Sequence, residues 1–182
     1  CNIPSPVEGF ANFAEYYGQE YVTVLKKIGF GAEVYRASEL YRSGVMNEMI
    51  QKALERRAVV RDIYFRISKS EKPEDWYPLN VICENCGNLS ATKITGFDGE
   101  LVDYTCSSDT IAWAKGCGHT GRMSPYNGNS KFPWKLDWAA KFVAQGVCFE
   151  GGGKDHYTKG GSRQVAEAIC REIFDHEPPY GV

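Results

Sequence analysis

The sequence lacks both a long apolar run and a strong excess of charge. Its 182 residues carry 21 basic and 23 acidic side chains, a formal net charge of −2. That balance gives no overall attraction to nucleic acid, although local basic patches remain compatible with it. No apolar stretch approaches the roughly 20 residues of a membrane span, and no signal-peptide pattern opens the chain. We therefore expect a cytoplasmic protein without membrane contact and, because residue 1 is Cys rather than Met, a piece of a longer chain.

Internal repeats and low-complexity segments are also absent, and cysteine is too sparse for a disulfide scaffold. Seven cysteines are present, and four of them fall between residues 83 and 117. We expect Cys148 and Cys170 to be small buried apolar side chains, and Trp76 and Trp113 to be packing residues. A chain of this length can bury a core, so we expect one domain, or one domain with a sizeable insertion.

Helical periodicity alternates with short apolar segments, which predicts an α/β protein. Helices are expected over residues 10–28, 39–42, 45–67, 136–144 and 163–174, and short strands over 32–36 and 147–149. Between residues 77 and 128, strand-like pieces at 79–82 and 101–105 alternate with turn residues and no helical period appears. We therefore predict an α/β domain in two parts, residues 1–76 and 129–182, separated by a β-rich insertion at 77–128.

The strongest spacing signal lies in that insertion. Two glycines, Gly87 and Gly118, each follow a cysteine and let the backbone turn so that its amides can point at sulfur. Four thiolates presented in this way fit a tetrahedral, structural Zn²⁺, which would stabilise an insertion with little core of its own. We predict a closed zinc site, rather than free thiols in a loop, with His119 as a substitute ligand and with the ligands Cys83, Cys86, Cys106 and Cys117.

Residues 132–161 have the pattern of a small-molecule pocket at the carboxyl end of a strand. Two tryptophans, Trp134 and Trp138, precede a short apolar segment that runs into Gly151-Gly152-Gly153-Lys154-Asp155-His156. Glycine allows a ligand to approach the backbone closely, and the amides of the following helix can face an anion. An aspartate there can accept from ribose hydroxyls or an ammonium group, and a histidine can donate to a phosphate or carboxylate. A purely conformational role for the glycine turn remains open.

Several motifs, in this order, resemble a class I lysyl-tRNA synthetase of the archaeal type: CENCGN, YTC, GCGHTG, FPWKLDWAAKFVAQGVCFEGGGKDH and GGSRQVAEAICREIFDHEPPYGV. The resemblance covers most of the chain and is most specific over residues 132–181. It implies part of a Rossmann-like catalytic domain with a zinc-ribbon-like insertion. It also implies lysine–tRNA ligase activity, in which lysine is activated with ATP, accompanied by Mg²⁺, and transferred to tRNA-Lys.

The same resemblance implies roles for individual residues. Trp134 and His156 would contact the lysine substrate, and Phe132 would line the same pocket. On the nucleotide side, the resemblance implies ATP-binding roles for Gly152, Gly153 and Asp155. The chemistry of tryptophan agrees with a role in lysine binding, because an indole can hold both the aliphatic stem and the ammonium group of lysine. We expect Trp138, which shares a helix face with Trp134, to belong to the core.

Two phosphate-handling motifs of this class, the HIGH and KMSKS types, are missing from their expected places. Arg66-Ile67-Ser68-Lys69-Ser70 matches KMSKS in letters but precedes the cysteine cluster, so we interpret it as a chance match. We therefore expect the 182-residue chain alone to be inactive. One alternative is a nucleotidyl-transfer enzyme of the same superfamily with another substrate. A second is a non-catalytic zinc-ribbon module that binds nucleic acid through Lys93, Lys115, Arg122 and Lys131, although a solvated surface explains these scattered cations equally.

Overall fold

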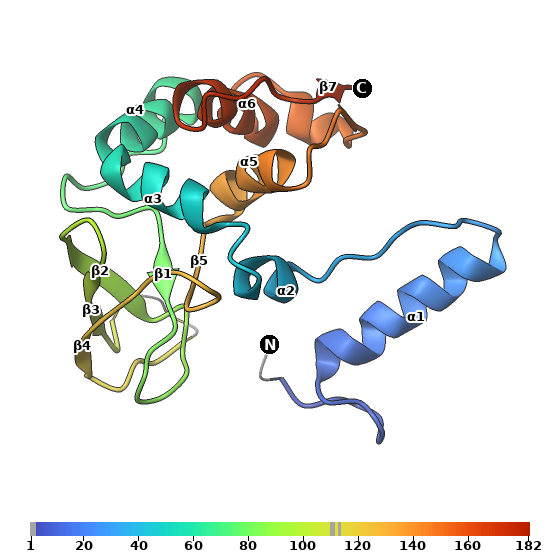
Figure 1. Cartoon of the computed structure of the whole chain (residues 1–182), viewed down its shortest axis with the longest axis horizontal. Helices are drawn as coiled ribbons and strands as arrows, with labels where there is room; N and C mark the ends of the chain where they lie inside the picture. The colour runs from blue at the N-terminus through green and yellow to red at the C-terminus, as the bar shows by residue number, and fades with distance from the viewer. Residues whose placement is uncertain (1–2, 110–111, 113) are drawn as a thin grey trace. The chain divides into compact units, whose positions relative to one another are not determined.

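The computed structural model describes residues 3–109, 112 and 114–182 (Figure 1). These residues form two compact units, one up to Arg36 and one from Ala37 onward. Trp113, which we expected to be a packing residue, lies outside the described part of the chain. Within the described part, none of the helices has the length and hydropathy needed to cross a membrane.

The first unit contains the helix α1 (Phe13–Lys27). Asn12 caps it, because its side-chain oxygen accepts the backbone N–H of Glu15 at 3.0 Å. No residue of α1 is buried, and its apolar stripe is exposed. The strand predicted over residues 32–36 is wrong, because that segment has neither helix nor strand structure. An alternating pattern forms a strand only where a neighbouring strand supplies hydrogen bonds.

Helices build most of the core of the second unit. After the short α2 (Ala37–Arg42) come α3 (Asn47–Glu55), α4 (Arg57–Ser68), α5 (Trp134–Ala144) and α6 (Ser162–Glu172). Helix α6 packs against both α4 and α5 (Figure 1). The core that these helices build contains fully buried apolar side chains, among them Ile50, Leu54, Ile63, Leu136 and Ile169.

The single helix predicted over residues 45–67 is wrong, because the chain breaks it into α3 and α4 at Arg56. Arg56 has φ −99° and ψ 25°, outside the helical range. Its guanidinium Nη1 donates to the carbonyl of Ile173, 3.3 Å away at the end of α6. The break therefore accompanies a contact between parts of the chain that are far apart in sequence.

The insertion forms an antiparallel sheet of three strands, β2 (Thr92–Phe97), β3 (Val102–Cys106) and β4 (Thr120–Met123). Every second residue of β3 is buried, starting with Val102. A smaller sheet pairs β1 (Asn80–Val81) with β5 (Ser130–Lys131), so the chain enters and leaves this region at adjacent points. The strands predicted at 79–82 and 101–105 are confirmed as β1 and β3, whereas β2, β4 and β5 were not predicted.

A parallel pair of short strands lies near the end of the chain. β6 (Phe149–Glu150) pairs with β7 (Tyr180–Gly181), and the 3₁₀ helix η1 (Lys154–Tyr157) and α6 lie between them in sequence. Strand, helix and parallel strand in this order form a βαβ unit. Because the other two sheets are antiparallel, the prediction is confirmed in its coarser part, a fold that mixes helices and strands. Cys170 is buried as expected, but the same expectation for Cys148 is wrong, because it lies exposed at the surface just before β6.

Candidate functional site

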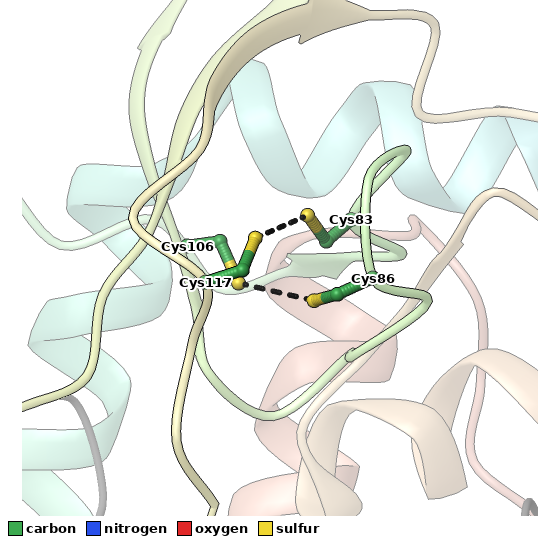
Figure 2. A group of neighbouring side chains, drawn as sticks. All are labelled: Cys83, Cys86, Cys106 and Cys117. Atoms are coloured by element: carbon green, nitrogen blue, oxygen red, sulfur yellow. Dashed lines mark hydrogen bonds between the residues drawn. The ribbon is translucent and has the colours of Figure 1, made fainter.

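The four cysteines of the insertion lie together. Their Sγ atoms are all within 4.8 Å of one another. The Sγ atoms of Cys83 and Cys117 are 3.7 Å apart, as are those of Cys86 and Cys106 (Figure 2). Sulfurs at the corners of a tetrahedron around Zn²⁺, with Zn–S bonds of about 2.3 Å, would be about 3.8 Å apart, whereas bonded disulfide sulfurs are about 2.0 Å apart. The geometry fits a metal-binding cluster and excludes disulfides.

Two glycine turns bring the thiols into place. Gly87 and Gly118, which follow Cys86 and Cys117, have φ of +70° and +79°, a region that favours glycine. A backbone hydrogen bond of 2.8 Å from Gly87 N–H to the Cys83 carbonyl closes the first turn, and one of 2.8 Å from Gly118 N–H to the Cys106 carbonyl ties the second turn to the end of β3. The glycines noted in the sequence are therefore required by the backbone at both turns.

The thiols differ in their electrostatic surroundings. The side-chain amide of Asn85 donates to Cys117 Sγ at 3.4 Å and holds the pKa of Cys117 at about 6. Burial raises the pKa of Cys106 to about 12. For Cys86, the backbone N–H of Asn88 lowers the pKa, but burial and neighbouring thiols outweigh it, so the net pKa is raised. A bound cation would favour the thiolate form at all of these positions.

The converging group consists of cysteines, and His119 does not belong to it. The His119 ring instead lies 6.0 Å from the ring of Tyr104, and its backbone carbonyl accepts the N–H of Cys106 at 2.8 Å. Four thiol ligands, two of them buried, form a closed set that could hold a metal such as zinc.

A second group of side chains lies at the start of α5. Trp134 and Trp138, one helical turn apart, stack with ring centres 5.0 Å apart and planes 13° from parallel. The ring of His156, from η1, lies 5.7 Å from Trp134 and 5.3 Å from Trp138. Trp134 is 52% exposed. The two helices thus form an aromatic wall that is open to solvent and carries an imidazole along one edge.

Trp138 anchors this wall to the rest of the unit. Its indole Nε1 donates to Glu150 Oε1 at 3.0 Å, and its ring contacts Phe142 at 5.5 Å. Trp138 is half-buried and packs against the hydrophobic core, as expected, while its outer face supports Trp134. Glu150 ends β6, so the wall lies at the carboxyl end of that strand.

A buried hydrogen-bond network holds the start of α5, and no sequence pattern predicted it. Asp137 is only 5% exposed and accepts from Tyr41 Oη and from Lys141 Nζ, each at 2.7 Å. Tyr41 Oη also accepts the backbone N–H of Phe132 at 3.1 Å. Phe132 is 2% exposed, and its ring contacts that of Tyr41. Burial, and then the Asp137 charge, raise the pKa of Tyr41, so its hydroxyl stays protonated.

The glycine turn after β6 combines packing with open space. A Cβ at Gly152 would lie 2.6 Å from the ring of Tyr157, so packing alone requires glycine there. A Cβ at Gly153 would meet nothing within 4 Å, and its φ of −64° suits any residue. Asp155 is exposed in η1. The backbone at Gly153 is therefore accessible to a ligand, whereas the glycine at position 152 is explained by its packing against Tyr157.

Two of the four cations considered as phosphate contacts in the insertion are neutralised within the protein. Lys93 Nζ pairs with Asp75 at 2.6 Å. Arg122 pairs with Asp103 and Asp98. These ion pairs favour the interpretation of this face as an ordinary solvated surface.

A βαβ unit with an aromatic wall at the carboxyl end of its first strand is typical of an α/β enzyme that binds a nucleotide or another small molecule. A sequence profile of the family described as "tRNA synthetases class I (K)" matches residues 1–182. The chain therefore belongs to that family.

Curated relatives agree with this assignment. The lysine–tRNA ligase of Methanosarcina barkeri (strain Fusaro) is 40% identical over 182 residues, which is 99% of this chain and 32% of the relative. That of Archaeoglobus fulgidus is 37% identical over 182 residues, 100% of this chain and 35% of the relative. That of Methanocaldococcus jannaschii is 34% identical over 177 residues, 97% of this chain and 32% of the relative. The chain thus spans about a third of the length of these relatives.

Proposed function

We propose that this chain is the amino-acid-binding part of a lysine–tRNA ligase, which activates lysine with ATP and transfers it to tRNA-Lys in the cytoplasm. The match to the class I (K) family over all 182 residues of this chain supports the proposal, and so do the names of the relatives. In this proposal residues 1–76 and 129–182 belong to a Rossmann-like catalytic domain, and 77–128 are its zinc-binding insertion. The parallel pair β6 and β7 and the closure of the insertion by β1 and β5 support that division.

The observation that carries the proposal is the aromatic wall. The exposed face of Trp134 suits the aliphatic stem of lysine, and an ammonium group over an indole gains cation–π energy of about 0.5–2 kcal/mol. Glu150, whose carboxylate accepts the indole N–H of Trp138, places a negative charge beside the same wall. His156 at the edge of the wall can donate a hydrogen bond to the substrate carboxylate. Phe132, buried behind the start of α5, supports this pocket from the core.

Activation requires the lysine carboxylate to attack the α-phosphate of ATP, with pyrophosphate leaving. Such a step depends on orientation and on charge stabilisation more than on proton transfer. In the proposal, the open backbone at Gly153 and the exposed carboxylate of Asp155 face the ribose side of ATP, with Mg²⁺ accompanying the phosphates. In the proposal, this step needs no covalent nucleophile from the chain. The insertion contributes a structural zinc at Cys83, Cys86, Cys106 and Cys117, where it stabilises the fold.

The proposal is tested by lysine-dependent exchange of pyrophosphate into ATP with the full-length protein. Trp134→Ala should raise KM for lysine by about 2- to 30-fold, the factor that matches about 0.5–2 kcal/mol, because it removes the exposed wall, while KM for ATP stays within about twofold. Trp134→Phe, which keeps an aromatic face, should recover part of the loss. His156→Ala should also weaken lysine binding. Exchange that depends on another amino acid, or no exchange at all, would show that the proposed function is wrong.

A further inference from the structure

One arginine is fully buried between the elements that carry the aromatic wall. Arg163, in the first turn of α6, is 1% exposed and is among the largest fully buried side chains of the described residues. Its Nε donates to Glu167 Oε1 at 2.8 Å, and its Nη2 donates to the carbonyl of Pro179, just before β7. The guanidinium is therefore bonded both to its own helix and to the segment that leads into the last strand.

Two aromatic rings lie against the same guanidinium. Its Cζ is 5.2 Å from the ring centre of Phe142, on α5, and 5.7 Å from that of Tyr157, at the end of η1. Phe142 contacts Trp138 with ring centres 5.5 Å apart, and Tyr157 directly follows His156 in the chain. Arg163 thus packs on both elements that carry the wall, and in each of them on the neighbour of a wall residue.

Tyr157 has little freedom to move in this place. Its hydroxyl donates to the carbonyl of Glu150, in β6, at 3.2 Å, and its ring packs against the glycine turn. A Cβ at Gly181, in β7, would lie 2.5 Å from the hydroxyl oxygen of Tyr157 and 3.1 Å from Arg163 Cζ. The tyrosine is therefore enclosed by two strands, a turn and the guanidinium. Because His156 is the preceding residue of the same short helix, a contact that fixes Tyr157 also fixes the backbone that presents the imidazole.

Stability alone does not explain an arginine at this position. A buried ion pair often contributes no more to stability than well-packed apolar side chains of similar volume, because both charges must leave water. Arg163 is also incompletely paired, since its Nη1 is buried and has no hydrogen-bond partner among the described residues. What the guanidinium adds is direction, because its planar fork fixes the angles between the groups that it binds, whereas apolar contact does not.

We propose that Arg163 is a positioning residue of the lysine site, which holds His156 at the edge of the aromatic wall through Tyr157. The expected effect on lysine binding rests on the proposed function. Arg163 itself is too deeply buried to touch the substrate. It fixes the ring of Tyr157 relative to α5 and so keeps the imidazole 5.7 Å from the ring of Trp134 and 5.3 Å from that of Trp138.

The first test is lysine-dependent pyrophosphate exchange with the full-length protein. Arg163→Met keeps the length of the side chain but removes the fork. It should raise KM for lysine by about 3- to 10-fold, the loss expected when one hydrogen bond to the substrate is misplaced, while KM for ATP stays within about twofold. In a His156→Ala background the same substitution should raise KM for lysine by less than about twofold, because no imidazole is left to misplace. Arg163→Lys, whose single ammonium group cannot form the fork, should behave like Arg163→Met.

Two further measurements make the test specific. Arg171→Met removes an exposed arginine of the same helix, which pairs with Glu177 at 3.5 Å, and should leave KM for lysine unchanged. Indole fluorescence reports the position of His156 whether or not the protein binds lysine, because a protonated imidazole quenches a nearby indole. The part of the fluorescence change between about pH 5 and pH 8 that His156→Ala abolishes should be mostly lost in Arg163→Met as well.

The outcomes separate the inference from the function beneath it. An unchanged KM for lysine in Arg163→Met, or an equal rise in the His156→Ala background, would overturn the inference and leave the proposed function intact. An equal loss in Arg171→Met would also overturn it, since the effect would then belong to the charge of the helix. If Arg163→Met does not fold, Arg163→Lys decides by the same measurements, and unaltered values in it would overturn the inference. Absence of exchange in the unaltered protein would refute the function, and the fluorescence measurement would then decide by itself whether Arg163 positions His156.

Discussion

Zinc affinity should rise steeply with pH, because the four thiols do not start from the same protonation state. Cys117, with a pKa of about 6, is already a thiolate at pH 7, whereas Cys106, with a pKa of about 12, is a thiol. The pKa of Cys86 is also raised. Zinc binding near neutral pH must therefore release at least two protons, from Cys86 and Cys106. Each released proton contributes a factor of about ten per pH unit, so the apparent affinity should rise at least about 100-fold per unit above pH 7.

The assay is a chelator competition on the metal-free full-length protein, repeated between about pH 7 and pH 8.5, inside the window set by these pKa values. Cys117→Ser should weaken binding yet leave the pH slope nearly unchanged, because Cys117 releases no proton in that window. His119→Gln should change neither quantity, because His119 is outside the converging group. X-ray absorption of the zinc-loaded protein should show four sulfurs at about 2.3 Å. A slope that corresponds to fewer than two protons, or a coordination shell with fewer than four sulfurs, would refute the reasoning.

Two further predictions concern the supports of the aromatic wall. Tyr41→Phe leaves a buried carboxylate oxygen of Asp137 without its donor, which should cost about 2–3 kcal/mol and lower the midpoint of urea unfolding; an unchanged midpoint would show that the bond is dispensable. Gly152→Ala would place a Cβ 2.6 Å from the Tyr157 ring and should lower the free energy of unfolding by about 1–3 kcal/mol. Gly153→Ala, with open space around the new Cβ, should have a melting temperature within about 1 °C of that of the unaltered protein. Equal melting temperatures of the two variants would contradict the packing argument.

The parts of the fold that the sequence predicted are those with strong local signals. The cysteine cluster could be predicted because a glycine follows Cys86 and Cys117, and both glycines adopt the positive φ that such turns need. Helix α6 could be predicted because its apolar residues recur at helical spacing. The motifs around Trp134 and His156 indicated a pocket, and the structure places their rings within 5.7 Å of each other.

The remaining features depend on contacts between residues far apart in sequence. The break between α3 and α4 at Arg56 could not be predicted, because no glycine or proline lies there. It accompanies a hydrogen bond from Arg56 to Ile173. The sequence predicts Asp137 to be an acidic residue in the first turn of a helix. Only its hydrogen bond to Tyr41, 96 residues away in sequence, reveals that its side chain is buried. An apolar residue before proline, such as Phe132, fits a pocket wall and a core equally well until its neighbours are known.

The pairing of β1 with β5 links the segment that leads into Cys83 to the segment that leads into the aromatic wall. Strand β5 ends at Lys131, Phe132 bonds to Tyr41, and α5 then begins with Trp134. Anything that loosens the insertion therefore loosens the segment that orients the indole. Under the proposed function, loss of a metal from the four cysteines would therefore lower the affinity for lysine through this segment of backbone.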